Sequence, residues 1–198
     1  MTPAAPSLGA FVLRTFLWMP PCFAAWYFSA PYLAAIAGGL ARLWVEAFNS
    51  GIVSALEREG SDLVFVTTIE VHPAPGQTAL LLPDVNGLLY TYGLAFFLAL
   101  MLAVRAKGWK ILLGAALLLP FQSWGIAFDF LAQVGVRLGP GVAAQAGLSG
   151  WRTEVIALGF QVGSLIFPPL IPVVLWAVFS RQFIESALRS RLPNTQTE

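Results

Sequence analysis

Apolar residues dominate four long stretches of the chain. A membrane-crossing helix needs about 20 residues to span roughly 30 Å of hydrocarbon. The four stretches run approximately from Phe11 to Ala37, from Leu88 to Val104, from Ile111 to Val136, and from Val155 to Phe179. This pattern predicts an all-α integral membrane protein in which four transmembrane helices form a bundle, as a single membrane domain over 1–198.

Residues 40–84 form the one sizeable segment outside the predicted spans. From Leu40 to Leu56, apolar residues recur at the spacing of an amphipathic helix that lies at the membrane interface or on the bundle. The next segment, DLVFVTTIEV, is rich in β-branched residues, and the breaker sequence HPAPGQT and then ALLLP follow it. That order is typical of a β-hairpin with a loop of about seven residues. We therefore expect a small cap, which either closes the bundle or docks a partner.

Lys and Arg residues fall unequally on the two sides of the predicted bundle. Seven of the 11 basic residues lie in the termini and in the short connection around residues 105–110, and the other four lie on the opposite side. Loops on the cytoplasmic side of membrane proteins are enriched in Lys and Arg. We therefore expect both termini inside (N-in, C-in) and the cap outside.

The third apolar stretch contains polar residues on one helical face. Gln122, Asp129 and Gln133 are spaced i, i+7, i+11. Counted from Lys110 at about 1.5 Å per residue, Gln122 lies about 18 Å deep and Asp129 about 28 Å deep, close to the outer boundary. A carboxylate at the bilayer centre costs about 2.5 to 3.5 kcal/mol, and less towards the headgroups. Asp129 should therefore face protein or water.

Polar residues of the neighbouring stretches reach the same outer half of the bundle. We expect a polar cluster whose candidate members are Asn86, Tyr90, Gln122, Asp129, Gln133, Arg152, Glu154 and Gln161. Two interpretations stay open. The cluster either supplies interhelical hydrogen bonds and interface anchors, or it forms a site for a substrate or a partner peptide.

Composition and chemistry narrow the function further. The chain is 58% hydrophobic and 11% charged, so we expect it to lie in a bilayer. Its net charge is +1 and it has no basic tract, so we expect no binding of nucleic acid. Cys22 and His72 are predicted on opposite sides of the membrane and cannot form a nucleophilic pair. With one cysteine and one histidine, we expect no metal or haem site, no cofactor and no enzyme.

Two alternatives involve Asp129. A small transporter or lipid-handling protein would use this acid to line a polar cavity in the outer half of the bundle. An intramembrane enzyme would use it with Glu154 as a carboxyl pair, which requires the two groups to lie within one substrate's width.

Four segments resemble the exosortase H-associated membrane proteins over most of residues 11–183. They are FLWMPPCFAAWYFSAP, PDVNGLLYTYGL, LLLPFQSWGIAFD and EVIALGFQVGSLIFPPLIPVVLW. The resemblance implies an accessory protein of an exosortase, a membrane transpeptidase-like enzyme that processes a C-terminal sorting signal on exported proteins of Gram-negative bacteria. It further implies that the chain lies in the bacterial inner (cytoplasmic) membrane and binds the exosortase or its exported substrate. Exosortases carry a Cys, Arg and His set that this chain cannot assemble.

Overall fold

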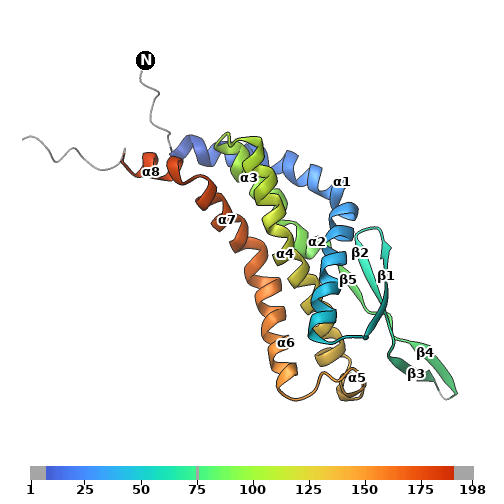
Figure 1. The fold of residues 1–198 in the computed structure, drawn as a ribbon. Helices are drawn as coiled ribbons and strands as arrows, with labels where there is room; N and C mark the ends of the chain where they lie inside the picture. Colours follow the sequence, from blue (N-terminus) through green and yellow to red (C-terminus); the bar gives the residue numbers. More distant parts are fainter. Residues whose placement is uncertain (1–7, 75, 190–198) are drawn as a thin grey trace, which may run out of the picture.

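The computed structural model describes residues 8–74 and 76–189, and most of these residues are helical. Long helices run side by side, and small sheets lie against one flank of the bundle (Figure 1). The helices are α1 (Leu8–Phe48), α2 (Leu88–Thr91), α3 (Gly93–Ala103), α4 (Gly108–Ala132), α5 (Pro140–Gln145), α6 (Trp151–Gln161), α7 (Phe167–Phe179) and α8 (Arg181–Arg189). Two π-helical segments continue α4 and join α6 to α7, namely η1 (Gln133–Arg137) and η2 (Val162–Ile166).

Three continuous helical runs are long and apolar enough to cross a membrane: Leu8–Phe48, Gly108–Arg137 and Trp151–Phe179. The structure is therefore a helical bundle with three candidate spans. The predicted second span is present as α2 and α3, but the run Leu88–Ala103 is shorter than the other three. Four crossings stay a prediction.

Helix α1 differs most from expectation, because the predicted separate amphipathic helix from Leu40 to Leu56 is wrong. Its first residues continue α1 to Phe48, and its last residues belong to strand β1 (Val53–Glu59). Leu43, Trp44 and Ala47 of the expected apolar face are exposed, and Ala41 and Val45 instead join the core of the bundle. Helical periodicity identifies a buried face but does not say whether membrane or protein covers it.

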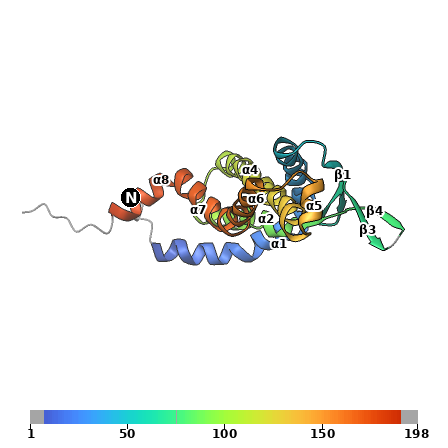
Figure 2. The ribbon, with the colours of Figure 1, turned by 90° about the horizontal axis from the view of Figure 1, so that it is seen from below.

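Helix α1 also bends in its middle (Figures 1 and 2). Its first half extends along one side of the bundle, and its second half runs beside α4. Pro20, Pro21 and Pro31 lie inside the helix, and each lacks the N–H that an intrahelical bond needs. Pro31 is nearest the middle, so we attribute the bend to it.

The cap contains five strands where one hairpin was predicted. They are β1, β2 (Asp62–Thr67), β3 (Glu70–Ala74), β4 (Gln77–Leu80) and β5 (Asp84–Asn86). The first, second and fifth form an antiparallel sheet in the order β1-β2-β5, and β3 pairs with β4. The segment DLVFVTTIEV is thus split into two strands, and Ala74 pairs with Gln77 across a turn much shorter than expected.

Strand β2 attaches the larger sheet to the bundle. Its side chains alternate between partly buried and buried positions. Phe65 stacks on Phe130 of α4 with ring centroids 4.5 Å apart. Leu63 fills the space above Gly38 of α1, where an added Cβ would come within 2.8 Å of its methyl group. The sheet therefore has a fixed position beside the C-terminal part of α4.

Glycines allow α4 to approach α6 and η2 closely. A Cβ on Gly159 would lie 2.2 Å from the ring of Phe128, and one on Gly163 would lie 2.9 Å from the Cα of Gly125. Small residues at helix contacts are typical of membrane bundles, because dispersion between close backbones replaces the hydrophobic effect.

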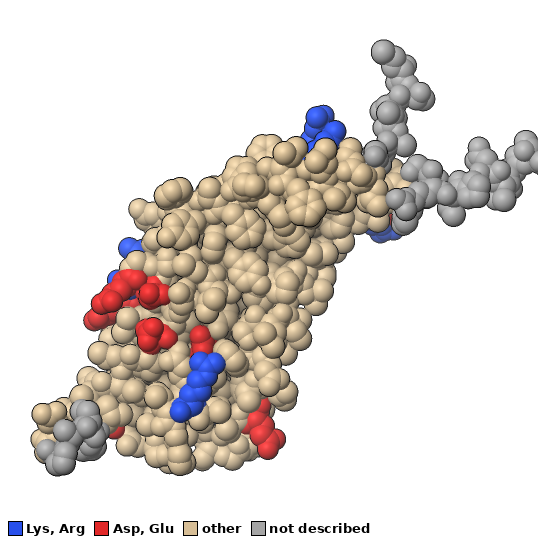
Figure 3. Space-filling model, turned by 180° about the vertical axis from the view of Figure 1, so that it is seen from behind, with Lys and Arg blue, Asp and Glu red and all other residues tan. Residues whose placement is uncertain are grey.

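The surface is consistent with a surrounding bilayer. Figure 3 shows a broad belt without Lys, Arg, Asp or Glu between basic groups at one end of the molecule and mixed charges nearer the other. Large apolar side chains point outward from the helices, including Phe16, Phe28, Leu112, Leu165 and Val178. An apolar surface of this extent requires a cover of lipid or protein.

Candidate functional site

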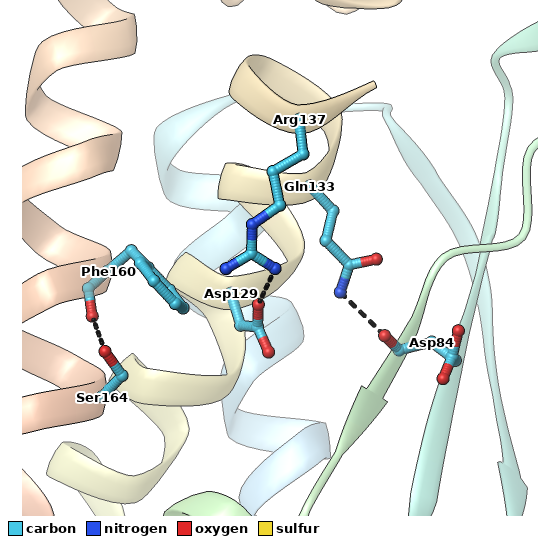
Figure 4. A network of polar contacts seen from close by, with 6 residues as sticks. All are labelled: Asp84, Asp129, Gln133, Arg137, Phe160 and Ser164. Atoms are coloured by element: carbon cyan, nitrogen blue, oxygen red, sulfur yellow. Dashed lines mark hydrogen bonds and ion pairs between the residues drawn. The ribbon is translucent and has the colours of Figure 1, made fainter. Parts of the chain in front are cut away.

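An ion pair lies at the end of α4 that is remote from the basic connection. The carboxylate of Asp129 is 7% exposed. Nη1 of Arg137 donates a hydrogen bond to Oδ1 of Asp129 at 3.3 Å (Figure 4). The Arg137 side chain is 51% exposed, so the acid is inside the protein while the guanidinium reaches the surface.

The π-helical segment η1 explains how Arg137 reaches Asp129. Eight residues of an α-helix turn through about 800°, which would leave Arg137 about 80° past the face of Asp129. A π-turn closes i→i+5 hydrogen bonds and holds one extra residue. With this extra residue, the eight residues from Asp129 to Arg137 turn through about the same angle as seven residues of an α-helix. That angle is about 20° short of two full turns. The irregular segment therefore places both charged groups on one face.

Arg137 also contacts the neighbouring helix α6. Its guanidinium carbon lies 4.6 Å from the centroid of the Phe160 ring, in cation–π geometry. The hydroxyl of Ser164, in η2, donates to the Phe160 carbonyl at 2.7 Å (Figure 4). The two π-helical segments thus lie on either side of the same site.

Two further side chains surround the Asp129 carboxylate. Tyr90 of α2 and Gln133 of η1 both interact with it. The Tyr90 ring lies over Gly125, one turn before Asp129, where a Cβ would come within 2.3 Å of the ring. Gln133 also donates from Nε2 to the backbone carbonyl of Asp84 in β5 at 2.8 Å (Figure 4). The site therefore joins α2, α4 and the sheet.

An open groove of about 490 Å³ runs past the ion pair. Its polar wall comes from Tyr90, Asp129, Arg137 and Ser164, and apolar side chains that include Leu89 and Leu165 line the rest. We call this feature the Asp129–Arg137 groove. A guanidinium has five N–H donors, so Arg137 can hold Asp129 and still donate to a carboxylate or carbonyl of a bound partner.

The structure brings together three of the eight predicted cluster residues, Tyr90, Asp129 and Gln133. It does not bring the other five to the ion pair. Oδ1 of Asn86 instead accepts the N–H of Leu88 at 2.9 Å, at the start of α2. Arg152 donates to the Gly147 carbonyl at 3.2 Å in the loop before α6.

Glu154, Gln161 and Gln122 also lie apart from the ion pair. Glu154 and Gln161 are exposed on α6. Gln122 is buried, and its Nε2 has no hydrogen-bond partner among residues 8–74 and 76–189. It lines a small cavity beside Pro168 and Pro172, which Tyr90 also lines. The five residues were grouped by helical spacing and by depth, and neither criterion puts side chains of different helices on facing surfaces.

Arg137 is the residue that sequence analysis missed. It was counted as a basic residue of an outward connection, because the third predicted span ends at Val136; in addition, i, i+8 is not a same-face spacing in a regular helix. No local pattern specifies the extra residue in the turn. Its position follows from packing against Phe160.

The sequence offers little for metal or nucleophilic chemistry here. Cys22 is buried inside α1. The backbone of His72 belongs to β3, and its side chain lies outside the described part of the structure. Within residues 8–74 and 76–189, no group of three or more His, Cys, Asp or Glu side chains could hold a metal ion.

Long apolar helices, an uncharged belt and an ion pair with a buried acid define a helical membrane protein with a polar site near one end of its bundle. A profile of the exosortase H-associated membrane protein family matches residues 5–183, and the chain belongs to that family. The family description names an associated membrane protein and no catalytic activity. No curated protein and no solved structure matches the chain.

Proposed function

We propose that the protein is a non-catalytic accessory subunit of an exosortase-type sorting system. It binds the exosortase or its exported substrate in the bacterial inner membrane, with both termini inside and the cap outside. Membership of the family supports the association with an exosortase. The observation that carries the binding role is the Asp129–Arg137 groove.

The groove suits a segment of a membrane-associated polypeptide. Its half-exposed guanidinium stands beside exposed apolar side chains, Leu89 and Leu165. Such a site accepts an apolar segment that carries one carboxylate or one unpaired backbone carbonyl. In a bilayer such a carbonyl finds no water, so a bond to Arg137 contributes more there than at an aqueous surface.

The cap provides a second contact surface on the same side. Residues 53–86, which form its strands and their connections, carry a net charge of −4. The acidic residues are Glu57, Glu59, Asp62, Glu70 and Asp84, and Arg58 is the one basic residue. β1 is an edge strand whose residues 57–59 are exposed. An extended partner segment with basic residues can pair with such an edge.

Site-specific photo-cross-linking tests this proposal. A photoreactive amino acid replaces Leu89 or Leu165 at the groove, and Leu112, exposed on the first turns of α4, serves as the matched control. We expect cross-links from the two groove positions to a multi-span peptidase or to an exported substrate, and none from Leu112. Equal cross-linking from all three positions, or from none, would contradict the groove as the binding surface.

The second candidate function is a small transporter or lipid-handling protein, which the polar and apolar lining of the groove favours. The substitution Asp129→Asn separates the two. If the protein is a transporter, the Asn variant loses flux and still assembles with its partners. If the protein is an accessory subunit, the Asn variant shows weaker cross-linking and poorer processing of sorted proteins, and the wild type shows no flux.

A further inference from the structure

A second polar pocket lies at the opposite end of the bundle from the Asp129–Arg137 groove. Its volume is about 370 Å³, and it lies between the turn from α3 to α4 and the junction of α7 with α8. Arg105, Lys107 and Lys110 line one side, and Ser180 and Phe183 line the other. We call it the basic-end pocket.

The charge in this pocket is one-sided. No Asp or Glu is among its lining residues. Nζ of Lys110 donates to the Phe179 carbonyl at 2.7 Å and so offsets the partial negative charge at the end of α7. Arg105 and Lys107 are exposed and form no ion pair with an acidic side chain in the described part of the chain. Two cationic groups are therefore available to an anion.

Ser180 provides independent evidence that the basic-end pocket binds a ligand. The residue is 6% exposed, and its Oγ is buried without a hydrogen-bond partner among residues 8–74 and 76–189. A buried hydroxyl without a partner carries a desolvation penalty. An acceptor oxygen in the basic-end pocket removes that penalty by accepting the Ser180 hydroxyl hydrogen.

Arg105 adopts a backbone conformation that favours glycine. Its φ is 53°, and no other described non-glycine residue has a positive φ. An L-residue with a large side chain is disfavoured in this region. The turn therefore presents a guanidinium at the pocket despite a backbone cost, as strained residues at binding sites often do.

The surroundings place the pocket where lipid headgroups lie. Helix α8 leaves the end of α7 at an angle, on the same side as the start of α1 (Figure 1). The Phe183 ring packs on Phe11 at 5.2 Å, whereas Arg181 and Glu185 pair in solvent at 2.7 Å. A short helix with one apolar and one charged face is typical of the membrane interface.

We propose that the basic-end pocket binds a phosphate group, which the headgroup of an anionic phospholipid supplies. Its acceptor oxygens take hydrogen bonds from the Ser180 hydroxyl and the Arg105 guanidinium, and Lys107 adds positive charge. Basic pockets between membrane helices bind phospholipid headgroups in this way. This binding is distinct from the accessory role and does not depend on it.

Lipid binding to the purified full-length chain tests the proposal. Native mass spectrometry in neutral detergent compares phosphatidylglycerol with phosphatidylcholine, and a separate arm adds inorganic phosphate as competitor. We expect phosphatidylglycerol to bind the wild type preferentially. The double variant Arg105→Gln with Lys107→Gln should lose about tenfold or more in affinity, since each charge-assisted hydrogen bond contributes strongly.

Three variants make the result specific. Arg14→Gln removes an exposed basic residue from α1, outside the pocket, and should retain binding. Ser180→Ala should weaken binding severalfold. Arg105→Gly relieves the strained φ, so it should fold at least as well as the wild type and still lose affinity, which separates binding from folding.

Each result either supports the proposed phospholipid site or overturns it. Preference for phosphatidylglycerol that the pocket variants lose supports a phospholipid source. Full competition by millimolar inorganic phosphate would instead make free phosphate the ligand and overturn the lipid source. Equal binding of both lipids, or unchanged binding by the pocket variants, would overturn the phosphate site.

Discussion

At the residue scale, Asp129 is a buried acid that side chains of two elements surround. Its carboxylate is enclosed by Tyr90, Gln133 and Arg137, which come from two separate parts of the chain. An ionised acid inside a bundle is tolerated when opposite charge and hydrogen-bond donors surround it. The half-exposed Arg137 therefore stabilises Asp129 and also reaches a partner.

Substitution of Arg137 by Gln should destabilise the protein through Asp129. Because the guanidinium is half exposed, we expect a loss of about 1 to 2 kcal/mol, below the value for a fully buried pair. Arg42→Gln is the matched control, because Arg42 pairs with Glu46 at 2.7 Å on the surface; it should cost less than about 0.5 kcal/mol. Chemical unfolding in detergent measures both, and equal losses would show that Asp129 does not depend on Arg137.

A second residue-scale prediction concerns Gly125. The Tyr90 ring lies where the Cβ of an alanine would be, at 2.3 Å, so Gly125→Ala must move the ring and the helix that carries it. Overpacking of this kind costs about 1 to 3 kcal/mol. Gly141→Ala in α5 meets no atom within 4 Å and should leave stability unchanged or slightly higher. Thermal unfolding compares the two, and an unaffected Gly125→Ala would disprove the tight contact.

At the element scale, irregular helical segments position the site. η1 brings Arg137 over Asp129, and η2 carries Ser164 to the other wall of the groove. A regular helix through 133–137 would point Arg137 away from the acid. The sheet holds this end of α4 in place through Gln133 and through the stacked rings of Phe65 and Phe130.

The attachment of the sheet should depend on Phe65. This side chain is fully buried, so Phe65→Ala should cost about 3 to 5 kcal/mol. Hydrogen exchange should rise in β1, β2 and β5 before it rises in α6 and α7. Leu80→Ala, on an exposed position of β4, is the control and should change little. Uniform exchange across the chain would mean that the sheet and the bundle unfold together.

At the scale of the whole molecule, polar chemistry is divided between two ends. The Asp129–Arg137 groove and the acidic cap lie towards one end, and the basic-end pocket lies at the other. An apolar belt separates them (Figure 3). A bilayer across this belt would put the two sites towards opposite surfaces of the membrane.

Cysteine labelling tests this arrangement. In a Cys22→Ala background, which removes the chain's one native thiol, new cysteines replace Glu57 in β1 or Lys107 before α4. A membrane-impermeant maleimide should label the first in intact spheroplasts and the second only after the membrane is opened. Labelling of both in intact spheroplasts would contradict opposite locations.

The sequence by itself determined the class of protein, the approximate position of its apolar helices, and three of the side chains at the site. These properties are local. A bilayer demands long uncharged runs, and an acid within such a run must face protein or water. Tyr90, Asp129 and Gln133 could be placed because helical spacing and depth follow directly from the residue number.

Only the tertiary structure decided the continuation of α1 to Phe48, the five-stranded cap and the role of Arg137. Each depends on contacts between residues far apart in the chain. The local sequence allows several conformations of similar energy. Contacts between distant residues, such as the pairing of β2 with β5 and the packing of Arg137 on Phe160, decide which of them forms.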